Sequence, residues 1–306
     1  MKASKEKTTP RALIFDIDNT VFDWVTYYVN SLQSMLQVVE DQIGVPYSEL
    51  AQQASKVFAE HGSIEYPFLV QELPAVMDHF GTDIDSMLQD LVGPSREAFK
   101  STGLRYLEPY AEVDKTFKKL KSKYPEVPVV ALTDAPRYVA MWKLNKLGLL
   151  PYFSAVYGLA DPRIPTDPVI GRVKVDPGIL LKHLQQVNFN YQGTIRTLPD
   201  EYEKPGIRGL KTVLMDLEIS DTSDCANTYW VGDNLAKDIR LGKAVGVCSI
   251  WAKYGAQVDS KLMDRLKEFS PPENLQKNVS IDPNDESSPK PDFILDSFSD
   301  LLKFIP

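Results

Sequence analysis

The sequence predicts an α/β protein with a doubly wound parallel sheet and an α-helical domain inserted after the first strand. Three observations support this prediction: short apolar runs alternate with amphipathic segments, the runs are continuously apolar, and one long stretch has only helical periodicity. Continuous apolar runs are typical of strands buried on both faces, as in parallel sheets. Because strands alternate with helices, the predicted core is Rossmann-like.

Six segments have the apolar character of buried strands: residues 11–15, 127–133, 155–158, 227–233, 245–251 and 292–295. Helical patterns lie between or after them, at residues 113–124, 137–150, 238–246 and 296–305. In the second of these, Gly148 is suited to end a helix because glycine readily takes the left-handed conformation.

Residues 24–106 interrupt this alternation, since they show helical periodicity and no convincing strand. They form the predicted helical domain, and residues 1–23 and 107–306 form a discontinuous core. Two stretches of the core depart from the simple pattern. Residues 187–226 are predicted to be an insertion, in which GLKTVLMDLEIS has the character of a core-packing helix, and residues 270–291, with five prolines, are predicted to be a polar surface loop.

The composition excludes several classes of protein. Of 306 residues, 43% are hydrophobic and 25% charged, which is typical of a soluble globular chain and not of a disordered one. A net charge of −8 argues against general nucleic-acid binding. No secretory signal and no membrane-spanning run is visible, and Cys225 and Cys248 fit free thiols, so we expect a cytoplasmic protein without a membrane partner. The oligomeric state is left open.

Several predicted strands end in acidic or hydroxyl side chains. The first ends at Asp16, with Asp18 two residues later; the second ends at Thr133 and Asp134; the fourth ends at Asp233, with Asp238 following. Ligands of open parallel sheets bind at the carboxyl ends of the strands, so Asp16, Asp18, Thr133 and Asp233 should converge there.

Carboxylates gathered in one crevice repel each other. Two like charges about 4 Å apart cost about 4 kcal/mol at an effective dielectric near 20. Raised pKa values or a bound cation would relieve this repulsion. Oxygen ligands without nearby His or Cys favour Mg²⁺, which usually binds through a few carboxylates and a substrate phosphate.

These residues resemble the motifs of the haloacid dehalogenase superfamily of aspartate-nucleophile hydrolases. DIDNT at residues 16–20 resembles the first motif, DxDxT, and Thr133 the second, a Thr or Ser at a strand end. VGDNLAKD at 231–238 resembles the fourth motif, GDxxxxD. The third motif is a lysine, often followed by proline; Lys174 in KVDP fits it, although Val175 stands where proline is common.

The resemblance implies a phosphoryl-transfer mechanism. Asp16 would be the nucleophile and form an aspartyl-phosphate, and Asp18 would protonate the leaving oxygen and then activate water. Mg²⁺ would be held by Asp16, the backbone carbonyl of Asp18 and Asp233.

The resemblance implies that the remaining motif residues bind the phosphate group and balance its charge. Thr133, with Asp134 and nearby backbone N–H groups, would form the phosphate-binding region. Lys174 would offset negative charge on the nucleophile and the phosphoryl group. Asp238 would support that lysine or the metal site. Asp134 departs from the family pattern, in which Asn or a small residue is common.

The family's dehalogenases do not need a second acid, so Asp18 favours phosphate-ester hydrolysis. Residues 24–106 resemble the family's helical cap of the first type (C1), which suggests a small phosphorylated metabolite such as a nucleotide, a sugar phosphate or phosphoglycolate. Two alternatives stay open: a phosphomutase of the same superfamily, and a non-catalytic protein that binds a phosphate ligand on the same fold.

Overall fold

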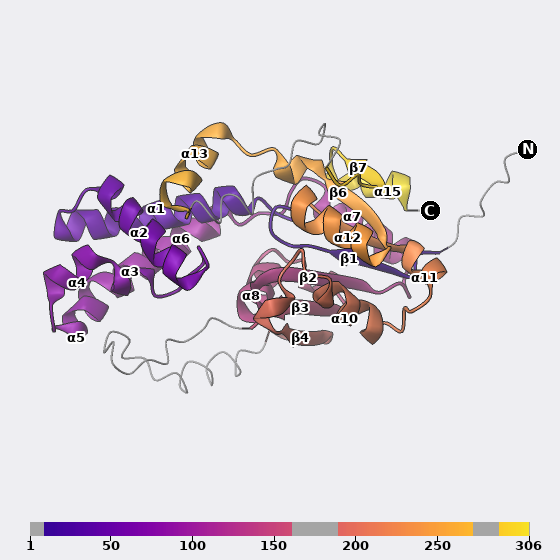
Figure 1. Ribbon diagram of the computed structural model, residues 1–306, viewed down its shortest axis with the longest axis horizontal. Coiled ribbons are helices and arrows are strands. Elements are labelled where there is room, and N and C mark those ends of the chain that lie inside the picture. The colour runs from indigo at the N-terminus through magenta and orange to yellow at the C-terminus, as the bar shows by residue number, and fades with distance from the viewer. Residues whose placement is uncertain (1–8, 161–188, 272–287, 306) are drawn as a thin grey trace, which may run out of the picture.

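A parallel sheet forms the core of the larger part of the molecule (Figure 1). The computed structural model describes residues 9–160, 189–271 and 288–305. Within them, seven strands lie in the order β4-β3-β2-β1-β5-β6-β7, and every pairing is parallel. The strands are β1 (Ala12–Phe15), β2 (Val129–Pro136), β3 (Ala155–Leu159), β4 (Thr194–Leu198), β5 (Thr228–Gly232), β6 (Cys248–Ala252) and β7 (Phe293–Leu295). The predicted α/β class is confirmed.

The side chains of β1 alternate between two apolar layers. Leu13 and Phe15 lie in one buried cluster, and Ala12 and Ile14 lie in another. The first cluster receives side chains from α7 (Val113–Lys123), α8 (Arg137–Lys146) and α15 (Leu301–Phe304), and the second receives them from α10 (Arg208–Asp216) and α12 (Arg240–Val245). Helices therefore cover both faces of the sheet, which explains why β1 and β5 are buried along their whole length.

Residues 24–106 form a group of helices at one end of the molecule, which we call the cap (Figure 1). It contains α1 (Trp24–Ile43), α2 (Tyr47–His61), α3 (Leu69–Glu72), α4 (Pro74–Phe80), α5 (Ile84–Ser86), the π-helical turn η1 (Met87–Val92) and α6 (Gly93–Tyr106). The Asp23 side chain caps α1 by accepting from the Thr26 amide at 2.9 Å. The amide of Tyr110 donates to the carbonyl of Val21 at 3.0 Å, so the two segments that connect cap and core lie side by side.

Strand β4 was not predicted, and it falls inside the stretch 187–226 that the sequence analysis treated as an insertion. It pairs with β3 at the edge of the sheet, and its first four side chains are exposed. Without a buried face, the strand has no apolar run that sequence reasoning could detect. The helix predicted from GLKTVLMDLEIS is confirmed as α10, with Leu210 and Val213 buried.

Helix α13 (Ser260–Phe269) was also not predicted, and it leaves the core to pack on the cap (Figure 1). Phe269 is fully buried, with its ring centroid 6.2 Å from that of Tyr28 in α1, and Arg265 donates to Gln33 Oε1 at 2.7 Å. The cap is therefore attached to the core by α13, which follows β6, as well as by the two segments that connect cap and core. Of the predicted loop 270–291, residues 272–287 lie outside the described residues.

Candidate active site

The acids of the first and fourth motifs meet at the carboxyl edge of the sheet. Phe15 of β1 is paired with Val231 of β5, so Asp16 and Asp233 follow their strands at nearly the same level. One oxygen each from Asp16, Asp233 and Asp238 lies within 4.8 Å of the others. The structure thus brings together Asp16 and Asp233, which the sequence predicted to converge, and places Asp238 beside them.

Gly232 allows this close approach. A Cβ atom at that position would lie 2.3 Å from Cγ of Asp238, which is too short for any contact. Asp238 is held by its own hydrogen bond, in which Oδ2 accepts from the Asn234 amide at 3.0 Å. The glycine of the fourth motif is therefore required so that a buried carboxylate can lie against the end of β5.

A lysine that the sequence analysis missed lies next to Asp16. The Nζ atom of Lys204 is 2.8 Å from Asp16 Oδ1 and 2.8 Å from Asp238 Oδ1, and the side chain is 5% exposed. Lys174, the predicted third-motif lysine, lies outside the described residues, and within them Lys204 makes the contact with the nucleophile candidate. The signal that could have identified it is the sequence EKPG at 203–206, where a lysine precedes proline.

Burial and mutual repulsion raise the carboxylate pKa values. Burial raises the pKa of Asp16 to about 7, although Lys204 acts in the opposite direction, and the negative charge of Asp238 adds to the rise. Burial, with the charges of Asp238 and Asp16, raises the pKa of Asp233 well above its ordinary value. Burial would lower the pKa of Lys204, but the adjacent carboxylates outweigh it and hold that pKa well above its usual range. The cluster therefore favours a cation.

Asp18 lies beyond β1, in an isolated bridge with Phe22, and a turn follows in which Asn19 takes the left-handed conformation with φ 55°. Its side chain is 23% exposed, and its Oδ1 is 2.8 Å from Nζ of Lys143 on α8. Burial raises the pKa of Asp18, while Lys143 opposes that rise. The two acids of the first motif thus have different lysine partners.

Thr133 and Asp134 lie within β2, which continues to Pro136 with an irregular register after Leu132. Thr133 is buried, and its hydroxyl accepts from the Ala135 amide at 3.1 Å. Asp134 Oδ1 accepts from the Lys204 amide at 3.0 Å, and Oδ2 accepts from Lys237 Nζ at 3.4 Å. The described contacts of Asp134 therefore hold the segment that carries Lys204, and the phosphate contact of Asp134 stays a prediction.

Comparison with known proteins identifies the family. The family model of haloacid dehalogenase-like hydrolases matches residues 10–246. The chain belongs to this family. No curated protein matches it closely enough to extend this assignment.

Three solved structures share the fold. The first is a 2-haloacid dehalogenase from Pseudomonas syringae pv. Tomato DC3000, with 17% identity, a TM-score of 0.54, and coverage of 96% of this chain and 97% of that one. The YfnB protein of Bacillus subtilis, a HAD-type hydrolase bound to magnesium, has 15% identity, a TM-score of 0.51, and coverage of 97% and 99%. A HAD phosphatase from Thermococcus onnurineus has 15% identity, a TM-score of 0.51, and coverage of 96% and 97%.

The donor set fits the divalent metal that this family typically uses. The cluster offers only carboxylate oxygens, which are hard ligands suited to Mg²⁺, and it includes no His or Cys among the described residues. Its three carboxylates also outnumber the one lysine that is bonded to them within the described part of the chain, and a cation would offset the remaining negative charge there. Separately, no helix in the described part of the chain is long and apolar enough to cross a bilayer.

Proposed function

We propose that the chain is a Mg²⁺-dependent phosphatase that hydrolyses a small phosphomonoester through an aspartyl-phosphate on Asp16. The observation that carries the proposal is the pair Asp16–Lys204 beside Asp233 at the carboxyl edge of the sheet. A buried carboxylate next to a lysine and further acids has the arrangement of an activated nucleophile with charge compensation. The phosphatase from Thermococcus onnurineus, which shares the fold, is consistent with this assignment.

In the first step, an Asp16 oxygen attacks phosphorus, and the bond between phosphorus and the ester oxygen breaks. Asp18, protonated, donates its proton to the leaving oxygen, so the alcohol departs neutral. Bound Mg²⁺, held by Asp16, Asp233 and the Asp18 carbonyl, would lower the repulsion between carboxylate and phosphate. Lys204 would offset the charge that develops on the phosphoryl oxygens.

In the second step, Asp18 is ionised and accepts a proton from a water molecule, whose oxygen attacks the phosphorus of the aspartyl-phosphate. The acyl-phosphate P–O bond breaks, inorganic phosphate leaves, and Asp16 is regenerated as a carboxylate. Thr133 and the amides near it are suited to bind the phosphoryl oxygens. Asp238 and Asp134 would act through Lys204, which they hold by its ammonium and its amide respectively.

Asp18 also separates this proposal from dehalogenation, the activity named for one structure with the same fold. A halide leaves as a stable anion and needs no proton, whereas an alkoxide is a strong base and does. An acid two residues after the nucleophile therefore favours an oxygen leaving group.

The test is Mg²⁺-dependent phosphate release from p-nitrophenyl phosphate, compared between the wild type and Asp16→Asn. We expect a loss in kcat of about 10³-fold or more, since losing a covalent nucleophile costs up to about 10⁶-fold elsewhere. Asp264→Asn, at an exposed position on α13, is the matched control and should keep full activity. Retention of a tenth of wild-type turnover by folded Asp16→Asn would contradict the nucleophile assignment. In a separate assay with a sugar phosphate as substrate, isomerisation without net release of phosphate would indicate a mutase instead.

A further inference from the structure

A second buried lysine lies outside the Asp16 cluster, at the boundary between core and cap. Lys143, on α8, has a fully buried side chain. Its Nζ lies 2.8 Å from Asp18 Oδ1 and 3.1 Å from Glu65 Oε1. We propose that Lys143 is a positioning residue: it fixes the Asp18 carboxyl for proton transfer and links its position to the cap through Glu65. The inference rests on the proposed function, since it concerns how Asp18 performs its role there.

Two aromatic rings lie near the Lys143 ammonium, in addition to its two carboxylate partners. Its Nζ lies 5.6 Å from the ring centroid of Phe22 and 5.9 Å from that of Tyr27. Removing an ammonium from water carries a large desolvation penalty, and an apolar side chain of similar volume often stabilises such a site better. Packing alone therefore gives no reason for a charge at this position, whereas a carboxylate that must be oriented does.

The geometry at Asp18 shows what is being fixed. Asp18 lies beyond the end of β1, in an isolated bridge with Phe22, so pairing within the seven-stranded sheet does not determine its rotamer. Among the described residues, Lys143 is the one side chain bonded to its carboxylate, and it engages Oδ1. Oδ2 is left to carry and deliver the proton. Because α8 follows β2 directly, the anchor is a fixed part of the core.

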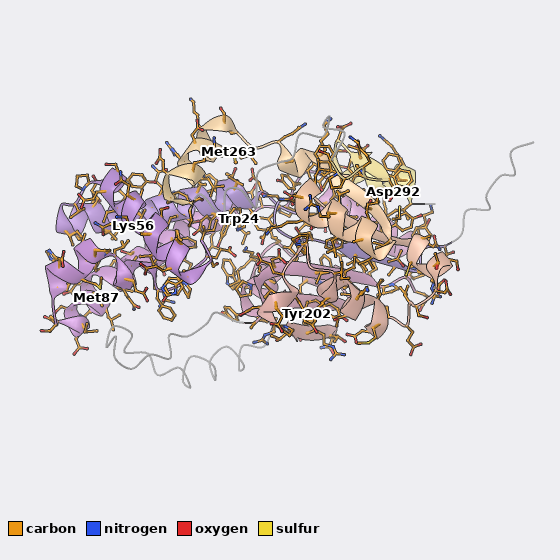
Figure 2. All side chains as sticks on the ribbon, viewed as in Figure 1. Trp24, Lys56, Met87, Tyr202, Met263 and Asp292 are labelled. Atoms are coloured by element: carbon orange, nitrogen blue, oxygen red, sulfur yellow. The ribbon has the colours of Figure 1, made fainter. Side chains whose placement is uncertain are left out.

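The other partner of Lys143 comes from the cap. Glu65 lies between α2 and α3, and its Oε1 also accepts from Trp24 Nε1 at 3.0 Å. Trp24 begins α1 and stacks on Tyr28 with ring centroids 4.8 Å apart, and Figure 2 shows it where the cap meets the core. The Tyr28 hydroxyl in turn donates to the carbonyl of Ile64, next to Glu65. A shift of this part of the cap would change the second contact of the lysine that holds Asp18.

The experiment compares two esters of similar size that differ in leaving group. Phenyl phosphate releases a basic phenoxide that needs a proton from Asp18, whereas p-nitrophenyl phosphate releases a much weaker base that leaves with little assistance. The value of kcat/KM reports phosphoryl transfer to Asp16 for both. For Lys143→Met, which keeps the length and removes the charge, we expect about a 10- to 100-fold loss on phenyl phosphate, part of the 10²–10⁴-fold worth of a general acid. On p-nitrophenyl phosphate we expect a loss below about threefold, because its leaving group departs with little need for a proton from Asp18.

Lys146→Met is the matched control, since Lys146 is exposed on the same helix. It should leave both esters unchanged. Equal losses on the two esters, or no loss, in folded and Mg²⁺-active Lys143→Met would overturn the inference while leaving the proposed function intact. A wild type that hydrolyses neither ester with Mg²⁺ would overturn the proposed function, and the role of Lys143 with it.

Glu65→Gln tests the link to the cap and does not require the core lysine to be removed. It should lose several-fold more on phenyl phosphate than on p-nitrophenyl phosphate, with unchanged far-ultraviolet circular dichroism. If Lys143→Met does not fold, this variant decides: a preferential loss on phenyl phosphate supports the inference, and an equal or absent loss overturns it.

Discussion

Replacing Lys204 with methionine tests the part of the site that the sequence analysis did not identify. The ammonium lies 2.8 Å from Asp16 Oδ1 and 2.8 Å from Asp238 Oδ1, with almost no exposed surface. At an effective dielectric near 20, each contact is worth about 6 kcal/mol before desolvation. Desolvation of the lysine offsets most of this, and removing one partner of a buried pair typically costs about 3–5 kcal/mol.

We therefore expect Lys204→Met to lower the free energy of unfolding by about 3–5 kcal/mol near neutral pH. A chain of this size shifts in Tm by about 2 °C per kcal/mol, so Tm should fall by roughly 6–10 °C. Turnover of p-nitrophenyl phosphate should fall by about 10²–10³-fold, the usual cost of removing one preorganised electrostatic contact. Thermal melts and steady-state assays with saturating Mg²⁺ measure both.

Two comparison variants make the result specific. Lys118→Met removes an exposed ion pair with Asp114, which should change stability little and leave turnover unchanged. Lys174→Met tests the lysine assigned from the sequence. The reasoning is refuted if folded Lys204→Met keeps a tenth of wild-type turnover, or if Lys174→Met shows the loss in its place.

Two further predictions concern the carboxylate cluster. Without divalent cations, burial raises the pKa of Asp16 from 3.8 to about 7, so the native state keeps a proton that the unfolded chain releases. The free energy of unfolding should therefore fall as pH rises from about 4 to about 7, and saturating Mg²⁺ should flatten this slope in thermal melts; a metal-free slope of opposite sign would contradict the prediction. Gly232→Ala should displace Asp238, because the new Cβ would lie 2.3 Å from the Asp238 Cγ. We expect this change to lower the free energy of unfolding by roughly 1–3 kcal/mol, as measured in thermal melts, and to remove most of the turnover. Gly93→Ala, whose nearest contact is an ordinary 3.4 Å, is its control, and equal effects in both would show that the close approach is not required.

The elements that the sequence predicted are those whose signals are local. The apolar run before Asp16 and the run before Asp233 identify β1 and β5, because strands buried on both faces are apolar throughout. Once the sheet is parallel, its topology brings both acids to one edge. The convergence of distant carboxylates could therefore be predicted without any knowledge of side-chain contacts.

The two elements that were missed differ in the signal they carry. Strand β4 has exposed side chains, so no apolar run marks it. Helix α13 has Leu262, Leu266 and Phe269 at helical spacing, a local signal that the sequence analysis did not use. The choice between Lys174 and Lys204, in contrast, depends on tertiary context. Both are single lysines in proline-containing stretches, and only the path of the chain after β4 brings Lys204 to Asp16. A charge partner is selected by distance in space, which sequence spacing does not encode.

The two acids of the first motif lie two residues apart, yet they contact separate lysines, and the mechanism that we propose gives this separation a chemical reason. A nucleophile has to be anionic when it attacks, so Asp16 needs a lysine that stays beside it in the core, and Lys204 is held there by Asp238 and Asp134. A general acid has to hold a proton and release it only when the substrate is enclosed. The lysine of Asp18 instead shares its charge with Glu65 of the cap. A single lysine between the two acids would couple both to the same contact, so that any change at the cap would also disturb the nucleophile. With two lysines, the position of the cap can bear on proton transfer while the charge around Asp16 stays fixed.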